Sequence, residues 1–305
     1  MMEKELSKLT TESRNVNSMN LSQMTTKEIL QTINNEDKKV AYAVEKVLPN
    51  IEQAIDQVYD AIQKGGRLFY VGAGTSGRLG VIDASECPPT FMTPPDMVQT
   101  VMAGGNGAYT NSAEGAEDNE IQGAIDLKAK ELTKNDVVVG ITASGRTPYP
   151  IGAVKHAAEV GAYTVSLSCN ERSEISEYAQ CNIEVIVDPE VLTGSTRMKA
   201  ATAHKMVLNM ISTTVMVKLG KVHENLMVDV HASNHKLMER AKSIIMEITN
   251  VTYEEAEKAL MLAGKEVKPA IVMIEAKVPL QIAKEAILNS DGYVGKAIQL
   301  AKMPN

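Results

Sequence analysis

The chain has 305 residues, a formal net charge of −7 and three cysteines. This length suits one large domain and a smaller one. Charges of both signs are mixed along an acidic chain, which argues against a nucleic-acid-binding surface. The cysteines form neither a disulfide framework nor a CxxC metal pattern, and no apolar run is long enough for a signal peptide or a membrane span. We therefore expect a cytoplasmic protein that contacts neither nucleic acid nor membrane.

The N-terminal part is predicted to be an arm followed by helices. Residues 1–24 are polar, and we interpret them as a loosely ordered arm. Thr25 and Glu28 have the spacing of a capping box, which predicts a short helix to about Ile33. Apolar residues then recur at three- and four-residue steps over residues 40–62, which predicts a second amphipathic helix.

Short apolar, β-prone runs alternate with helical patterns from residue 67 onward. The runs cover residues 68–71, 97–103, 136–142, 163–169 and 183–188, and the helical patterns lie near residues 111–132, 148–160 and 172–180. This alternation predicts the α/β class, with a doubly wound parallel sheet and helices on both faces. Ligands bind beyond the carboxyl ends of the strands in such sheets. The loops to consider are residues 72–78, 103–117, 142–148 and 189–197.

The loop at residues 72–77 joins the first strand to a helix predicted to end before Pro88. Free backbone N–H groups and the helix dipole make such a helix start a site for an anion. Thr75, Ser76 and Arg78 add hydroxyl and guanidinium donors suited to a terminal phosphate. The loop is therefore predicted to hold a phosphate group.

The same loop matches the dinucleotide fingerprint GxGxxG, but its context does not. That fingerprint needs an acidic residue about 20 positions further on, after the next strand. The next predicted strand ends in Ala103-Gly-Gly, and Asp83 and Glu86 come too early. The spacing therefore disfavours a nicotinamide or flavin cofactor.

A second hydroxyl-rich loop, TASGRTP at residues 142–148, follows another predicted strand. It offers Thr142, Ser144 and Thr147 around a glycine, and Pro148 suits a first helical turn. One such loop alone is often only a helix N-cap. Two of them after strands of one sheet can converge on the same phosphate.

Four potential cations lie where a long helix, predicted to end at about Lys218, begins. They are Arg197, Lys199, His204 and Lys205. Cations in a first helical turn oppose the helix dipole and need another partner. An anionic ligand and salt bridges to neighbouring carboxylates are both open readings.

The remaining sequence, from about Asn225, is helical in pattern with no strand signal, and Thr252 with Glu255 predicts another capping box. The predicted organisation has three parts. Residues 1–66 form the arm and helices, residues 67–224 the α/β phosphosugar-binding domain and residues 225–305 a small helical subdomain.

Two carboxylates near these loops are candidates for acid–base chemistry. Glu86 is predicted at the carboxyl end of the first sheet helix, where the dipole disfavours it, and Glu117 lies in an acidic stretch typical of a first helical turn. Ser76 and Glu86 would lie about 15 Å apart along one helix. Either that helix is short and folds back, or Glu86 serves a second subunit. We favour a homodimer with a composite site.

Four motifs together resemble the N-acetylmuramic acid 6-phosphate etherase family, sugar isomerase (SIS) domain proteins related to glucokinase regulatory proteins. The motifs are GAGTSGRLG (72–80), DASECPPT (83–90), ASGRTP (143–148) and TGSTRMKA (193–200). The resemblance runs from TESRN (11–15) to Val230. It implies cleavage of a lactyl ether by elimination and water addition, with no metal or organic cofactor.

The resemblance also implies roles for individual residues. Glu86 would protonate the departing lactate and Glu117 would act as the base. Arg14 of TESRN would cover the ligand, which conflicts with a loosely ordered arm. The expected substrate-binding residues are Thr75, Ser76, Thr142, Ser144, Thr147 and Arg197.

Two other functions fit a phosphosugar site of this kind. A non-catalytic sensor would bind the ligand without turnover and would not need the two glutamates. An aldose–ketose isomerase needs a base but no acid to expel a leaving group. No helix-turn-helix segment precedes the sheet, which disfavours a transcription regulator.

Overall fold

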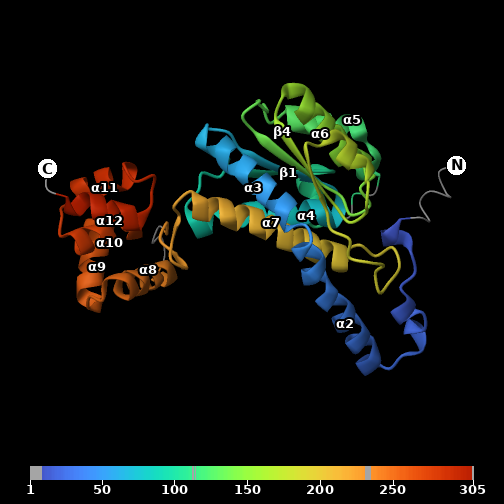
Figure 1. Ribbon diagram of the computed structural model, residues 1–305, viewed down its shortest axis with the longest axis horizontal. Coiled ribbons are helices and arrows are strands. Elements are labelled where there is room, and N and C mark those ends of the chain that lie inside the picture. The colour runs from blue at the N-terminus through green and yellow to red at the C-terminus, as the bar shows by residue number, and fades with distance from the viewer. Residues whose placement is uncertain (1–8, 112, 114, 231–234, 304–305) are drawn as a thin grey trace. The chain divides into compact units, whose positions relative to one another are not determined.

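The computed structural model describes residues 9–111, 113, 115–230 and 235–303, which form two compact units (Figure 1). The first unit consists of Met1–Ser85 and Asp96–Ser212. The second unit consists of Glu86–Pro95 and Thr213–Asn305. Two long helices, α4 (Gly74–Phe91) and α7 (Lys199–Lys218), contribute residues to both units.

The first unit is built on a parallel sheet in the order β2-β1-β3-β4-β5, which confirms the doubly wound fold. The strands are β1 (Leu68–Gly72), β2 (Val98–Met102), β3 (Val137–Ile141), β4 (Tyr163–Ser168) and β5 (Cys181–Glu184). Chain order reverses between β1 and β3, where Gly72 pairs with Ile141. Crevices for ligands form at such a reversal, beyond the carboxyl ends of the strands.

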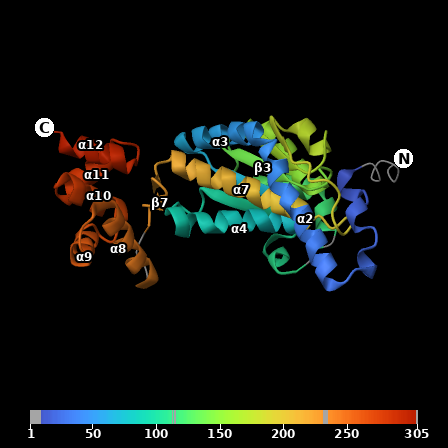
Figure 2. The ribbon, with the colours of Figure 1, turned by 60° about the horizontal axis from the view of Figure 1, so that its bottom comes forward.

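Helices cover both faces of this sheet. On one face, α3 (Leu48–Gln63) lies with the first-unit parts of α4 and α7, and on the other α5 (Glu120–Lys128) packs against α6 (Pro148–Val160) (Figures 1 and 2). Alternation along β1 explains this arrangement, because successive side chains point to opposite faces. Phe69 and Val71 share a buried cluster with Tyr149 of α6. Tyr70 donates a hydrogen bond of 2.9 Å to Asp83 of α4.

Asp83 joins α4 to α7 on that face. Its buried carboxylate also accepts hydrogen bonds from Asn209 (2.6 Å) and Ser212 (3.0 Å) of α7. Burial raises the pKa of Asp83, although these hydrogen bonds oppose the shift. Asp83, which lies too early in the sequence to bind a cofactor ribose, therefore links α4 to β1 and α7.

The N-terminal helices differ from their predicted bounds. The Thr25–Glu28 capping box is present, but α2 continues from Thr26 to Glu45 instead of ending near Ile33. The break falls inside the apolar stripe, where α3 begins with Pro49 in its first turn. Pro49 has no N–H to donate to the carbonyl of Glu45, which disfavours a continuous helix there, and proline suits the first turn of a new helix.

The prediction of a loosely ordered arm is wrong for the described residues of that segment. Three 3₁₀ turns occupy Thr10–Glu12, Val16–Ser18 and Leu21–Gln23. The Asn15 side chain donates to the carbonyl of Pro189 at 2.8 Å, and Ser18 Oγ donates to the carbonyl of Val191 at 2.7 Å. These bonds attach the arm to the loop before α7. Residues 1–8 of the predicted arm lie outside the described residues.

Helix α4 also exceeds its prediction, because it passes through Pro88 and Pro89 before ending at Phe91. Each proline removes one backbone donor, and the two fall within the last turn and a half of the helix. Glu86 therefore lies within a helix rather than at its carboxyl end.

The second unit holds a two-stranded hairpin and a helical bundle. Strands β6 (Val222–His223) and β7 (Leu226–Met227) pair antiparallel, so the expectation of no strand beyond Asn225 is wrong by one short strand. The helices are α8 (His235–Thr249), α9 (Tyr253–Leu262), α10 (Val267–Ala276), α11 (Leu280–Leu288) and α12 (Val294–Lys302). The Thr252–Glu255 capping box is present. Within the described residues, no helix is both long and apolar enough to cross a bilayer.

Candidate functional site

The loop after β3 gathers the three hydroxyl side chains identified in the sequence. Thr142 Oγ1 lies 2.8 Å from Thr147 Oγ1 and 3.3 Å from Ser144 Oγ, which also accepts from the Arg146 N–H at 3.1 Å. Gly145 has φ +74°, and a Cβ there would overlap the Ser173 side chain. A glycine is therefore required for the turn that brings the hydroxyls together.

The loop after β1 lies at the neighbouring strand end, across the β1–β3 reversal. Thr75 and Ser76 occupy the first turn of α4 and are half-buried. Helix α4 thus starts beside the hydroxyl cluster, with its unpaired N–H groups at the same edge of the sheet. Two sets of hydrogen-bond donors thus come from loops that follow adjacent parallel strands.

Arg78 bonds to the loop after β2. Its Nε donates to the carbonyl of Tyr109 at 3.2 Å and its Nη2 to the carbonyl of Asn111 at 2.9 Å. Arg78 therefore holds the loop after β2 against the start of α4. This is the loop that leads to Glu117. The expected contact of Arg78 with a phosphate stays a prediction.

Glu117 is exposed and lies in a 3₁₀ turn, Ala116–Asp118, ahead of α5. The predicted helix over residues 111–132 is wrong in its first part, because Gly115 adopts φ +80° and α5 starts only at Glu120. A small cavity of about 100 Å³ separates this turn from the loop after β1. It is lined by Ala73, Gly74, Arg78, Met102, Ala103, Ala108, Ala113 and Glu117.

Glu86 is exposed on α4, ten residues after Ser76. Because α4 is unbroken from Gly74 to Phe91, the two residues are about 15 Å apart along its axis. The alternative in which a short helix folds Glu86 back toward Ser76 is therefore wrong. Within one chain, α4 does not bring this carboxylate to the helix start.

The cations at the start of α7 have different surroundings. Lys199 is fully buried and pairs with Glu36 of α2 at 2.9 Å, so the salt-bridge reading is correct for this residue. Burial by itself would raise the pKa of Glu36, but hydrogen bonds from Lys39, Lys199 and Asn17 lower it to about 2. Arg197 is exposed. The expected contact of Arg197 with substrate therefore stays a prediction.

His204 is not a cation available to an anionic ligand. Its side chain is fully buried, and burial lowers its pKa to about 4, so the imidazole is neutral at pH 7. Its Nδ1 lies 3.4 Å from Ser76 Oγ, and its Nε2 lies 3.5 Å from Cys169 Sγ. His204 thus contacts the hydroxyl of Ser76, one of the predicted phosphate-binding residues, from the interior of the unit.

Asn170, after β4, is a site residue that no sequence motif indicates. Its buried side-chain amide donates to the carbonyls of Ala143 (3.1 Å) and Ser144 (3.3 Å) and to Thr11 Oγ1 (3.2 Å). Its Oδ1 accepts from the Thr10 N–H at 2.8 Å. Asn170 therefore fastens the hydroxyl-rich loop and the N-terminal arm together. Its position directly after a predicted strand, at the ligand-binding edge, was the available signal.

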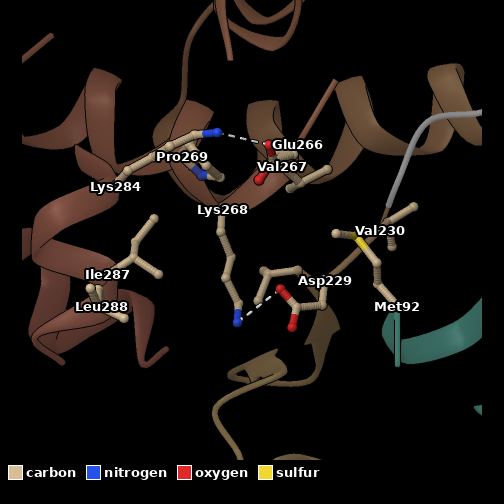
Figure 3. Close-up of a pocket in the computed structure, with 11 residues that line it drawn as sticks. Met92, Asp229, Val230, Glu266, Val267, Lys268, Pro269, Lys284, Ile287 and Leu288 are labelled. Atoms are coloured by element: carbon tan, nitrogen blue, oxygen red, sulfur yellow. Dashed lines mark hydrogen bonds and ion pairs between the residues drawn. The ribbon is translucent and has the colours of Figure 1, made fainter. Parts of the chain in front are cut away.

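The second unit has a larger, mainly apolar cavity of about 380 Å³ (Figure 3). Lys268 at its base is mostly buried and pairs with Asp229 at 2.8 Å, and Asp229 also pairs with Lys221 at 2.8 Å. The wall includes Met92, Val230, Ile287 and Leu288. Among the residues that the structure describes, none of the predicted site residues lines this cavity.

Family models and relatives agree on the protein family to which this chain is similar. Residues 50–158 match the glucokinase regulatory protein N-terminal SIS domain, residues 116–217 the SIS domain and residues 224–286 the C-terminal lid domain of glucokinase regulatory protein. A phosphoheptose isomerase structure from Francisella tularensis is similar at TM-score 0.49 and 15% identity, covering 64% of this chain and 100% of that one.

Curated relatives match over nearly the full length. The chain is 58% identical to the N-acetylmuramic acid 6-phosphate etherase of Bacillus pumilus, covering 98% of both chains. It is 56% identical to that of Bacillus subtilis and 51% identical to that of Pectobacterium atrosepticum, each covering 96% of this chain and 97% of the relative. The chain therefore belongs to the N-acetylmuramic acid 6-phosphate etherase family of enzymes.

Proposed function

We propose that this chain cleaves the D-lactyl ether of N-acetylmuramic acid 6-phosphate to N-acetylglucosamine 6-phosphate and D-lactate. The observation that carries the proposal is identity above 50% with etherases over nearly the whole chain. The two hydroxyl-lined loops at adjacent strand ends suit the phosphate of such a sugar. The three cysteines are buried and form no disulfide, and all lie in the described part of the chain, which fits a reducing cytoplasm.

In this proposal the sugar phosphate lies at the β1–β3 reversal. Ser76, Ser144 and Thr147 donate to its oxygens, and the N–H groups at the start of α4 and its dipole favour the dianion. Thr75 and Thr142 complete the set of hydroxyls. Arg197 contributes a guanidinium from the loop before α7.

The proposed chemistry is an elimination followed by an addition of water. In the open-chain sugar the C1 aldehyde acidifies the proton on C2, and Glu117 as base removes it. The C–H electron pair forms the C2–C3 double bond while the C3–O bond breaks, and Glu86 as acid protonates the departing lactate oxygen. Water then adds its oxygen to C3 and a proton to C2, which gives the two products.

The proposed active form is a homodimer whose site combines residues of two chains. The support is the unbroken α4, which separates Ser76 and Glu86 within one chain by about 15 Å. Glu86 of the partner subunit then faces the sugar held by the loops of the first chain. Both glutamates are exposed in the single chain and so are available at a subunit contact.

The direct test is to incubate the purified chain with N-acetylmuramic acid 6-phosphate and measure D-lactate enzymatically. We expect stoichiometric D-lactate and N-acetylglucosamine 6-phosphate, and no lactate from unphosphorylated N-acetylmuramic acid. Binding without lactate release would indicate a sensor, and a ketose product would indicate an isomerase. Either outcome with folded protein would overturn the proposal.

A further inference from the structure

We propose that His204 and Cys169 form a buried hydrogen-bond relay, a fixed chain of donors and acceptors, which directs the Ser76 O–H toward the sugar phosphate. This inference rests on the proposed phosphate site and assigns positioning roles to two residues outside it. The contacts are Ser76 Oγ to His204 Nδ1 at 3.4 Å and His204 Nε2 to Cys169 Sγ at 3.5 Å.

The three groups carry a fixed number of hydrogens at neutral pH. Burial keeps the imidazole of His204 neutral, with one N–H, and burial also raises the pKa of Cys169, so the thiol keeps its proton. Ser76 contributes one O–H. The relay therefore has two arrangements, which differ in the ring nitrogen that carries the proton.

The thiol selects between these arrangements. If His204 carries its proton on Nε2, the Cys169 S–H must turn to the carbonyl of Ala200, which is 4.0 Å away. That carbonyl, in α7, is the more distant of the two acceptors near the sulfur. If the proton is on Nδ1, the S–H donates to Nε2 at 3.5 Å instead. The structure therefore favours the Nδ1–H tautomer.

The favoured tautomer prepares Ser76 for an anion. His204 Nδ1–H donates to Ser76 Oγ, which occupies a lone pair of the hydroxyl and leaves its proton free to point away from the ring. Ser76 lies in the first turn of α4, where the phosphate is proposed to bind. A dianion needs donors there, and hydrogen bonds to charged groups are the strong ones. In the other tautomer the Ser76 proton would point back to His204.

The test combines a spectroscopic readout with two matched variants of the full chain. Long-range ¹H–¹⁵N spectra distinguish the two tautomers, and among the five histidines of the chain the His204 signals are those lost in His204→Asn. We expect a proton on Nδ1 in the wild type. A proton on Nε2 would overturn the proposal whether or not the chain cleaves the ether.

The variants separate positioning from packing. The amide nitrogen of Asn can replace Nδ1, and that of Gln replaces Nε2. We therefore expect His204→Gln to weaken binding of N-acetylglucosamine 6-phosphate and of inorganic phosphate about tenfold, with His204→Asn close to wild type. Cys169→Ala should weaken binding less and shift His204 toward Nε2–H, whereas Cys169→Ser should restore Nδ1–H. Equal binding by the Asn and Gln variants, with both folded by circular dichroism, would contradict the relay.

Discussion

The two halves of the proposed site are built in different ways. The hydroxyls of Thr142, Ser144 and Thr147 contact one another in a partly buried loop that Asn170 holds in place. Glu86 and Glu117 are exposed in the single chain. The proposed phosphate binding follows from the topology of one sheet edge, because adjacent parallel strands end there. The proposed acid–base chemistry depends on the environment that a bound sugar and, in the proposed homodimer, a second subunit would supply.

The largest effect should come from substituting the two exposed glutamates. Replacing Glu117 or Glu86 by Gln keeps the shape and removes the acid–base group, so kcat should fall by about 10³-fold. Steady-state D-lactate release measures this, with the binding of N-acetylglucosamine 6-phosphate expected to change little. Asp118→Asn, beside Glu117 in the same turn, is the matched control and should stay near wild type. A Glu117 variant as active as this control would remove the glutamate from the reaction.

The next largest effect concerns the buried ion pair between Lys199 of α7 and Glu36 of α2. Lys199→Met would leave Glu36 as a buried carboxylate without its buried partner, which should lower the free energy of unfolding by about 3 kcal/mol. Urea denaturation followed by circular dichroism measures the change. Lys39→Met removes the partly exposed partner of the same carboxylate and should cost less than about 1 kcal/mol. Equal losses would show that burial of Lys199 is not the cause.

The same ion pair should make stability depend on acid pH. The pKa of Glu36 is about 2 in the folded chain, below the usual value of 4.5, so the carboxylate binds protons less readily when folded. Its stabilising contribution is therefore present above about pH 4.5 and is lost as the pH falls toward 2. Comparing wild type with Glu36→Gln isolates this contribution. A stability difference between them that is constant from pH 6 to pH 3 would contradict it.

The smallest effect should come from removing one of the three hydroxyls in the loop after β3. Ser144→Ala deletes one donor to the phosphate while the Thr142–Thr147 contact remains, so KM should rise about tenfold with kcat nearly unchanged. Ser195→Ala, in the loop before α7, provides a serine control. If Ser144→Ala lowers kcat instead of raising KM, the hydroxyl acts in the chemical step and not in phosphate binding.

The difference between the two halves also separates what the sequence predicts from what it does not. The loops after β1 and β3 were predictable because each pattern is local and the parallel alternation brings them to one edge. The ordered arm was not, because its bonds join Thr10 and Thr11 to Asn170, far along the chain. The continuation of α4 through Pro88 and Pro89 was also missed, since local rules treat proline as a helix end.

Charged residues show the same limit. Lys199 and His204 both read as cations at a helix start, yet one is paired with Glu36 and the other is neutral by burial. Only the packing of α2 and α4 against α7 distinguishes them. Spacing identifies which residues share a face of a helix, but their protonation depends on partners from other elements.

The most direct test of the shared site is a heterodimer purified through two different tags, with Glu86→Gln in one chain and Glu117→Gln in the other. If Glu86 serves the partner's sugar, one of the two sites carries both substitutions and the other carries none. The heterodimer should then recover about half of the wild-type rate of D-lactate release, far above either parent. A heterodimer as inactive as its parents would contradict a site shared between subunits.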